Sequence, residues 1–178
     1  MNKNNKNATL EILADIAQTF NPELEKHEDE RCIIYPMAFR SFSTGSEIFL
    51  ALVYNKEPET VSISAEFLEV PDKKKFTDCL YLVNELNRLV PYGTFKYNYE
   101  EDSIFVGRDL ICFGDHRVTH DEVFGAITSI IAPFDILQET AQSFIDGKIL
   151  RELLPLALVK AQDAFFENKE EDEEDEEE

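Results

Sequence analysis

The sequence is poor in the patterns on which catalysis and covalent cross-linking depend. Its 178 residues include only six glycines, which do not cluster, so there is no glycine-rich phosphate loop and no G-x-S-x-G motif. The three cysteines, Cys32, Cys79 and Cys112, lie in apolar runs and lack metal-ligand spacing, so we expect free thiols in a reducing compartment. A chain of this length buries roughly 70% of its unfolded surface, and its core therefore requires no disulfide or metal.

Long hydrophobic runs and basic residues are also scarce. No apolar run reaches the roughly 18 residues of a membrane span, and no basic segment leads into an apolar one at the N-terminus. Lys and Arg number 17 against 37 Asp and Glu, which gives a net charge of −20. Because nucleic-acid affinity depends on basic side chains that neutralise phosphates, we expect no nucleic-acid partner. The lack of a long apolar run and of a basic leader segment predicts no membrane partner and a cytoplasmic location.

The acidic residues are concentrated at the C-terminus. The unbroken run Glu170–Glu178 repels itself and has no apolar side chains, which predicts a disordered acidic tail over residues 169–178. Such a tail either solubilises the protein or docks a basic partner. Residues 1–7 are polar and predict a flexible leader, so residues 8–168 remain as a single domain.

Hydrophobic periodicity divides the first half of this domain into one helix and three strands. Helical spacing runs from Ala8 to Phe20. Strands are predicted over residues 31–39, 47–54 and 60–70. Pro36 places the first strand at an edge or a bulge, whereas the second is apolar on both faces and should be central.

A second helix is predicted to begin at Pro71-Asp72 and to end at the segment Asn84-Glu85-Leu86-Asn87-Arg88. Near its end, Asn87 should satisfy terminal carbonyls or the turn that follows. The expected buried stripe is Phe76, Cys79, Leu80, Val83, Leu86 and Val90, with Thr77, Glu85 and Arg88 facing solvent.

A hairpin follows, with arms at residues 92–100 and 103–113. Phe95, Tyr97 and Tyr99 share one face of its first arm. Such a stripe is more often core than binding surface, but the two tyrosine hydroxyls must reach water or a partner. These three residues are therefore our candidates for partner binding.

Two helical segments complete the domain. Thr119 and Glu122 form a T-x-x-E capping box, and Pro133 should kink or restart the helix that follows, which ends at Asp146-Gly147. A last helix is predicted over residues 148–168. Its apolar stripe either packs on the sheet or builds a dimer.

The order α-β-β-β-α-β-β-α plus an extra C-terminal helix predicts an α+β fold with helices packed on an antiparallel sheet. With Asn84-Glu85-Leu86-Asn87-Arg88 closing the middle helix and Tyr92-Gly93-Thr94-Phe95 opening the next strand, the chain resembles the YbjN family. That resemblance implies the fold of type III secretion chaperones. It also implies a non-enzymatic, cytoplasmic bacterial protein with a chaperone-like or regulatory role, and a homodimer that holds a partner's segment on apolar grooves.

The sequence thus favours a protein-binding module whose partner segment lies on an apolar groove or pairs with a sheet edge. We expect no enzyme, no cofactor and no metal. The alternative is a small metal-dependent enzyme that uses His116 and His120, two histidines at i and i+4 among carboxylates. They straddle a loop and a helix start, unlike the single helix of the H-E-x-x-H motif.

Overall fold

A computed structural model of the chain describes residues 3–23, 25–41, 45–70, 72, 75–91, 93–112 and 118–175, with side chains described from residue 8 to residue 167 of these. The elements are α1 (Lys3–Phe20), β1 (His27–Glu28), β2 (Cys32–Arg40), β3 (Glu47–Lys56), β4 (Glu59–Glu69), α2 (Phe76–Leu89), β5 (Thr94–Asn98), β6 (Ser103–Ile111), α3 (His120–Ile145), the 3-10 turn η2 (Arg151–Leu153) and α4 (Leu154–Asp175). This order confirms the predicted α+β class. It adds one short strand, β1, in a segment for which the sequence predicted neither a helix nor a strand.

The six strands form one antiparallel sheet in the order β1-β2-β3-β4-β6-β5. The second predicted strand is central, as expected, because β3 lies between β2 and β4. The predicted alternation of the third is also confirmed, since Val61, Ile63, Ala65 and Phe67 of β4 are all buried. A two-residue turn at Glu57-Pro58 joins β3 to β4, and an irregularity between Glu66 and Leu68 shifts the register of β4 against β6.

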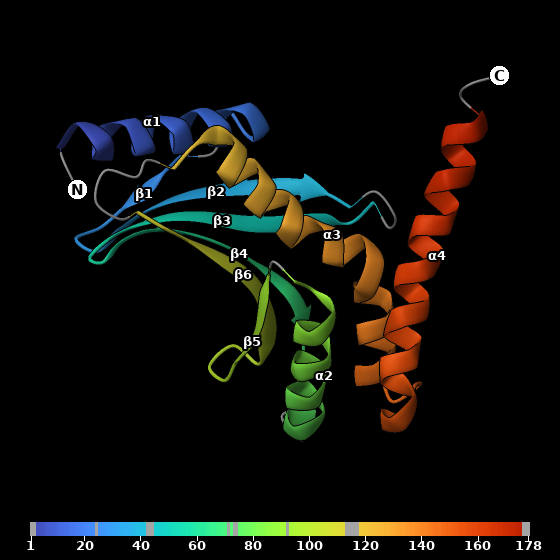
Figure 1. Ribbon diagram of the computed structural model, residues 1–178. Coiled ribbons are helices and arrows are strands. Elements are labelled where there is room, and N and C mark those ends of the chain that lie inside the picture. The colour runs from blue at the N-terminus through green and yellow to red at the C-terminus, as the bar shows by residue number, and fades with distance from the viewer. Residues whose placement is uncertain are drawn as a thin grey trace.

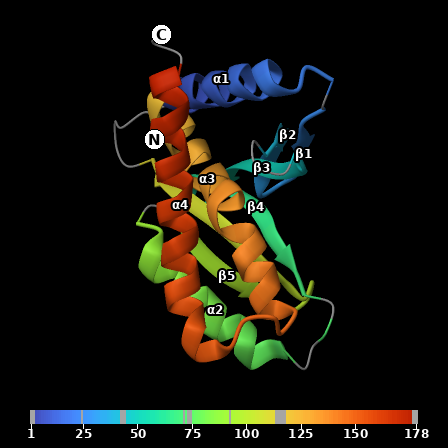
Figure 2. The same ribbon diagram turned by 90° about the vertical axis from the view of Figure 1, so that its right-hand side faces the viewer.

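All the helices that contact the sheet lie on one side of it. Helix α1 packs on β2 and β3, α3 packs on β4 and β6, and α2 packs on β5 (Figure 1). The buried apolar residues of the strands alternate toward these helices, so the single core lies between the sheet and the helical layer. Helix α4 contacts α3 and α2 and stands at the outer side of the molecule (Figure 2).

Helix α2 differs from its prediction in start and in phase. It begins at Phe76, after the predicted Pro71-Asp72, and its buried residues are Cys79, Leu82, Glu85 and Leu86. Leu80 is exposed and Glu85, predicted to face solvent, is only 6% exposed. The Glu85 carboxylate is compensated by Arg88, whose Nη1 lies 2.9 Å from its Oε2. The prediction failed because apolar residues occupy a wide sector of this helix. Such a sector does not determine which residue lies at the middle of the buried face to better than about one position.

Helix α3 begins as predicted and continues through Pro133, where a kink or a restart was predicted. The capping box is confirmed: the Glu122 N–H donates to Thr119 Oγ1 over 3.2 Å, and the Thr119 N–H donates to Glu122 Oε2 over 2.8 Å. Pro133 does not restart the helix, which is continuous from His120 to Ile145. Its end follows the prediction, since Gly147 has a φ of 78° and the Lys148 N–H donates to the Ser143 carbonyl.

Both terminal helices differ from their predicted bounds. Helix α1 begins at Lys3 instead of Ala8, and α4 runs from Leu154 to Asp175 instead of from residue 148 to residue 168, after the 3-10 turn η2. The disorder of residues 169–178 stays a prediction, because their side chains lie outside the described part. Within the described residues, no helix is both long enough and apolar enough to cross a membrane.

Candidate functional site

The face of the sheet opposite the helices is a wide surface, which we call the open face. On β2 and β3 it is apolar, because the register pairs Ile34 with Val53, Pro36 with Ala51 and Ala38 with Phe49. Phe49 is 68% exposed, although it belongs to a strand whose other face is buried. A row of apolar side chains without a covering helix is the kind of surface that mediates protein contacts.

Toward β4, β6 and β5 the open face becomes polar and hollow. Ser62 and Ser64 of β4 lie beside Asp109 and Gly107 of β6. A Cβ atom on Gly107 would come within 3.1 Å of the Ile63 carbonyl oxygen, so only glycine fits this point of the sheet without a shift. A hollow of about 530 Å³ follows, lined by Ser64, Lys96, Tyr97, Asn98, Tyr99, Glu100 and Phe105.

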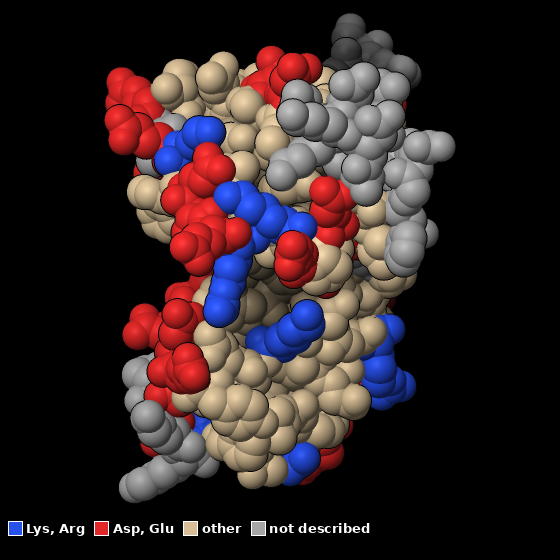
Figure 3. All heavy atoms as spheres, turned by 90° about the vertical axis from the view of Figure 1, so that its left-hand side faces the viewer, with Lys and Arg blue, Asp and Glu red and all other residues tan. Residues whose placement is uncertain are grey.

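Basic side chains collect on a protein that is acidic as a whole. Viewed from the left-hand side of Figure 1, Lys and Arg side chains surround a hollow in a largely uncharged surface, with Asp and Glu beside them (Figure 3). Lys96 lines the hollow of about 530 Å³, and Lys96 and Arg108 line the adjoining one of about 120 Å³. A partner segment on this part of the open face therefore meets Lys96 and Arg108, with Glu100 and Asp109 beside them.

The three predicted contact residues do not share one environment. Phe95 is 1% exposed and makes an edge-to-face contact with Phe67 at a centroid distance of 5.0 Å, which places it in the core. Tyr97 and Tyr99 do come together, at 5.1 Å, and both contact the Phe76 ring. Tyr99 is 64% exposed at the hairpin tip. Thus the rings of Tyr97 and Tyr99 pack with Phe76 on the α2 side of the hairpin and border the hollow, whereas Phe95 belongs to the core.

Asp102 fixes the position of Tyr97. The Tyr97 hydroxyl donates a hydrogen bond to Asp102 Oδ1 over 3.0 Å. Desolvation of the ring, followed by this hydrogen bond and the charge of Asp102, raises the pKa of Tyr97 to about 12. The hydroxyl therefore stays protonated at neutral pH, and its proton is used in the hydrogen bond to Asp102 within the hairpin.

Asn87 closes the edge of the sheet at β5. Its Nδ2 donates to the Phe95 carbonyl oxygen over 3.0 Å, and the Phe95 N–H donates to its Oδ1 over 2.7 Å. The side-chain amide thus takes the place of a neighbouring strand at Phe95. The prediction that Asn87 serves the end of its helix or the following turn missed this partner, which is the strand beyond the turn.

The other edge of the sheet is also a poor template for an added strand. The two residues of β1 cover only Ile33 and Ile34 of β2. Farther along β2, Pro36 has no N–H to donate to a strand on either side. Both edge strands therefore lack a continuous row of free backbone groups with which a partner strand could pair. The open face is the better candidate for partner binding.

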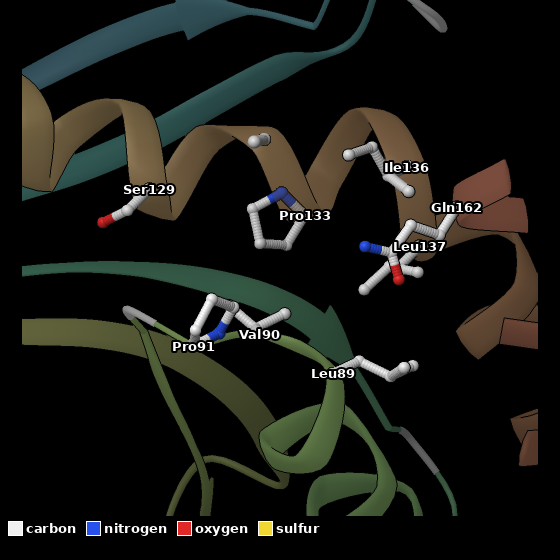
Figure 4. A pocket seen from close by; sticks show the side chains of 9 residues that line it. Leu89, Val90, Pro91, Ser129, Pro133, Ile136, Leu137 and Gln162 are labelled. Carbon is white, nitrogen blue, oxygen red and sulfur yellow. The ribbon is translucent and has the colours of Figure 1, made fainter. Parts of the chain in front are cut away.

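A separate apolar cavity of about 170 Å³ lies between the end of α2, the middle of α3 and α4 (Figure 4). Its lining is Leu89, Val90, Pro91, Ser129, Ala132, Pro133, Ile136, Leu137 and Gln162. Pro133 has no N–H for the Ser129 carbonyl one turn earlier, so the helix lacks one hydrogen bond beside this cavity. The sequence predicted that Pro133 kinks or restarts the helix, but it did not indicate that this residue lines a cavity.

The proposed metal pair is only half described. His116 lies outside the described residues. His120 begins α3, and its Nε2 is 3.1 Å from Asp15 Oδ2 of α1. Among the described residues, no group of three or more His, Cys, Asp and Glu side chains is arranged to hold a metal ion.

Comparisons with known proteins do not identify a family for this chain. No family model matches the chain, and no curated protein matches it in sequence. The chain is similar to a chain in a solved structure described as "Crystal Structure of the ExsC-ExsE Complex", with 13% identity, 72% of this chain and 90% of that chain covered, and a TM-score of 0.48. At that identity and TM-score the likeness carries no function over, and the YbjN resemblance stays a prediction.

Proposed function

We propose that this protein is a non-enzymatic protein-binding module that holds an extended segment of a partner protein on the open face. The observation that carries the proposal is the one-sided covering of the sheet: every helix that contacts the sheet lies on one side, and the other side presents Phe49 and the hollow at Lys96. A chaperone-like or regulatory role in the bacterial cytoplasm, as the YbjN resemblance implies, agrees with this arrangement.

The open face also specifies the chemistry of the segment. Aliphatic or aromatic side chains fit the apolar half formed by β2 and β3. An acidic side chain fits next to Lys96 at the hollow. An extended chain places alternate side chains about 7 Å apart on one face, so a single segment can reach several positions of the sheet.

The test compares substitutions on two surfaces. Phe49→Ser with Lys96→Ser changes two exposed side chains of the open face, and Leu156→Ser with Phe166→Ser removes two exposed apolar side chains of α4. Both double variants should keep the circular dichroism spectrum and the unfolding midpoint of the wild type, because all four positions are exposed. Partners captured from bacterial lysate should be lost with the first variant and kept with the second.

Identification of the contact needs a direct measurement. A photo-crosslinking residue at position 49 or 96 should attach to the captured partner, and peptide mapping should place the link in one short segment. A folded first variant that captures the same partner equally well would refute the assignment to the open face. Loss with the second variant alone would transfer partner binding to α4.

A further inference from the structure

The apolar cavity between the end of α2, the middle of α3 and α4 has the size of a small aromatic molecule. Its volume is about 170 Å³, and an apolar cavity of about 150 Å³ accommodates benzene. Figure 4 shows the Pro133 ring pointing from α3 toward Val90 and Pro91, with Leu89 and Leu137 to one side. Side chains from three helices or their ends therefore surround a space that is wide enough for one flat ring.

The lining is almost entirely apolar. Among the described residues that line the cavity, only Ser129 and Gln162 are polar, and none is charged. The Ser129 hydroxyl already donates to the Ala126 carbonyl oxygen over 2.7 Å. Small-molecule sites typically combine such an apolar lining with a few polar groups that fix the orientation of the ligand. The cavity therefore suits a mostly apolar ligand.

The polar group that fixes orientation is the main-chain carbonyl of Ser129. In a regular helix the N–H four residues later donates to such a carbonyl, and at that position Pro133 has no N–H. A Cβ atom on Gly93 would lie 3.8 Å from the Ser129 carbonyl oxygen and 3.5 Å from Val90 Cγ1. The oxygen therefore faces the turn after α2, on the side where Val90 and Pro91 line the cavity.

This acceptor determines the chemistry of the ligand. A buried acceptor without a donor costs free energy, so a ligand that brings one donor gains more here than a purely apolar one. A cationic donor does not fit, because no carboxylate among the described lining residues compensates its charge. The donor is therefore a neutral hydroxyl or N–H group.

We infer that this cavity is a binding site for a small, neutral aromatic molecule that carries one hydroxyl or N–H group, with phenol as its simplest form. The ring lies between Pro133 on α3 and Val90 and Pro91 after α2, and the donor points at the Ser129 carbonyl. The site does not use the open face, so this inference stands independently of the proposed function.

The first experiment titrates the full chain with phenol and follows the methyl groups by NMR. The methyl signals of Leu89, Ile136 and Leu137 should shift with a dissociation constant of about 1 mM or lower, whereas those of Val53 on the open face should not. No shift at these three residues, or equal shifts at Val53, would overturn the inference.

The second experiment isolates the hydrogen bond. Toluene has the shape of phenol and no donor. Pro133→Ala supplies the missing N–H to Ser129, so the affinity for phenol should fall about tenfold relative to the affinity for toluene. The variant also enlarges the cavity, but both ligands experience that change equally. An unchanged ratio of the two affinities would refute the pairing of the donor with the Ser129 carbonyl.

The third experiment fills the cavity. Ala132→Leu places a larger side chain in the lining and should weaken the binding of phenol and toluene at least about tenfold. The matched control is Thr128→Leu, at an exposed position of the same helix outside the lining, which should leave both affinities unchanged. If folded Ala132→Leu protein binds both ligands as well as the wild type, the ligands lie elsewhere and the inference fails.

A last arm distinguishes a free ligand from a tyrosine side chain of a partner protein. N-acetyltyrosinamide carries the same phenol on a peptide unit, which has polar groups that the apolar lining does not satisfy. It should bind at least about tenfold more weakly than phenol. Tighter binding than phenol would assign the cavity to a partner's side chain and overturn the assignment to a free molecule.

Discussion

At the scale of single residues, Asn87 connects the end of a helix to the edge of a sheet. Its two hydrogen bonds with the Phe95 backbone span a turn that the sequence marks with Pro91 and Gly93. The sequence showed that Asn87 lies where a helix ends, but it could not show the strand on the far side of the turn. That contact depends on the angle between α2 and β5, which local pattern does not determine.

Replacement of Asn87 by alanine should lower the free energy of unfolding by about 1–2 kcal/mol, because two net hydrogen bonds are lost. The measurement is urea denaturation followed by circular dichroism. The matched control is Asn84→Ala on the same helix, where the side-chain Nδ2 donates to Glu85 Oε1 over 3.3 Å and the loss should be under about 0.5 kcal/mol. Equal losses would show that the clamp on Phe95 contributes nothing of its own.

Tyr97 gives the protein a pH dependence that is confined to alkaline solution. Its pKa is about 12 in the folded protein against an ordinary 10.0. Below pH 10 both states hold the proton and stability does not depend on this group. Between pH 10 and 12 the unfolded state loses its proton first, so the stabilisation is progressively lost as pH rises.

The unfolding free energy of the wild type should therefore fall more steeply from pH 10 to 12 than that of Tyr97→Phe. Asp102→Asn should bring the pKa of Tyr97 down toward 10, as followed by phenolate absorbance, because the neighbouring negative charge is removed. Asparagine also tolerates the positive φ of 50° at this position. Identical slopes for the wild type and Tyr97→Phe would contradict the role assigned to this hydroxyl.

At the scale of elements, local signals predicted ends better than interiors. The start of α3 follows from Thr119 and Glu122 alone, and its end follows from Gly147, because caps are made by residues adjacent in sequence. The restart that was one of the two outcomes predicted for Pro133 does not occur, because the cost of one missing hydrogen bond is local and packing compensates for it. Pro133 and its neighbours Ile130, Phe134 and Leu137 are buried, which holds the helix together across the proline.

The contribution of the capping box can be measured directly. Thr119→Ala should cost about 1 kcal/mol of unfolding free energy, and Thr119→Ser should retain most of the wild-type stability because its hydroxyl can accept the same hydrogen bond. Hydrogen exchange at the first turn of α3 should be faster in the alanine variant and unchanged in the serine variant. If serine destabilises as much as alanine, the effect comes from the lost methyl group and not from the cap.

At the scale of the whole molecule, the sequence predicted the layer architecture because alternation and helical spacing determine which face of each element is apolar. It predicted the binding candidates less well. Phe95, Tyr97 and Tyr99 alternate along one arm, but the arm ends at Asn98, so Tyr99 lies at the tip and Phe95 in the core. It left open whether the last helix completes the core, and the burial of Leu154 and Leu158 answers that its first two turns do.

Two truncations test this division of α4. A chain that ends at Glu167 keeps Leu154, Leu158 and Gln162, and its unfolding free energy should stay within about 0.5 kcal/mol of the full-length value. A chain that ends at Ile149 loses both buried leucines and uncovers the cavity lined by Leu89 and Ile136. Since each buried leucine contributes about 2–5 kcal/mol, this shorter chain should unfold at much lower urea or fail to fold.

The full-length variant Leu158→Ala provides the control that does not depend on truncation. It should lose about 2–5 kcal/mol, whereas Leu156→Ala, at an exposed position of the same helix, should lose under about 1 kcal/mol. If the shorter truncation and Leu158→Ala both leave stability unchanged, α4 is an appendage and the folded domain ends with α3. If the shorter truncation and Leu158→Ala destabilise the protein and the truncation after Glu167 does not, the start of α4 is part of the folded domain and the segment beyond Glu167 is dispensable for its stability.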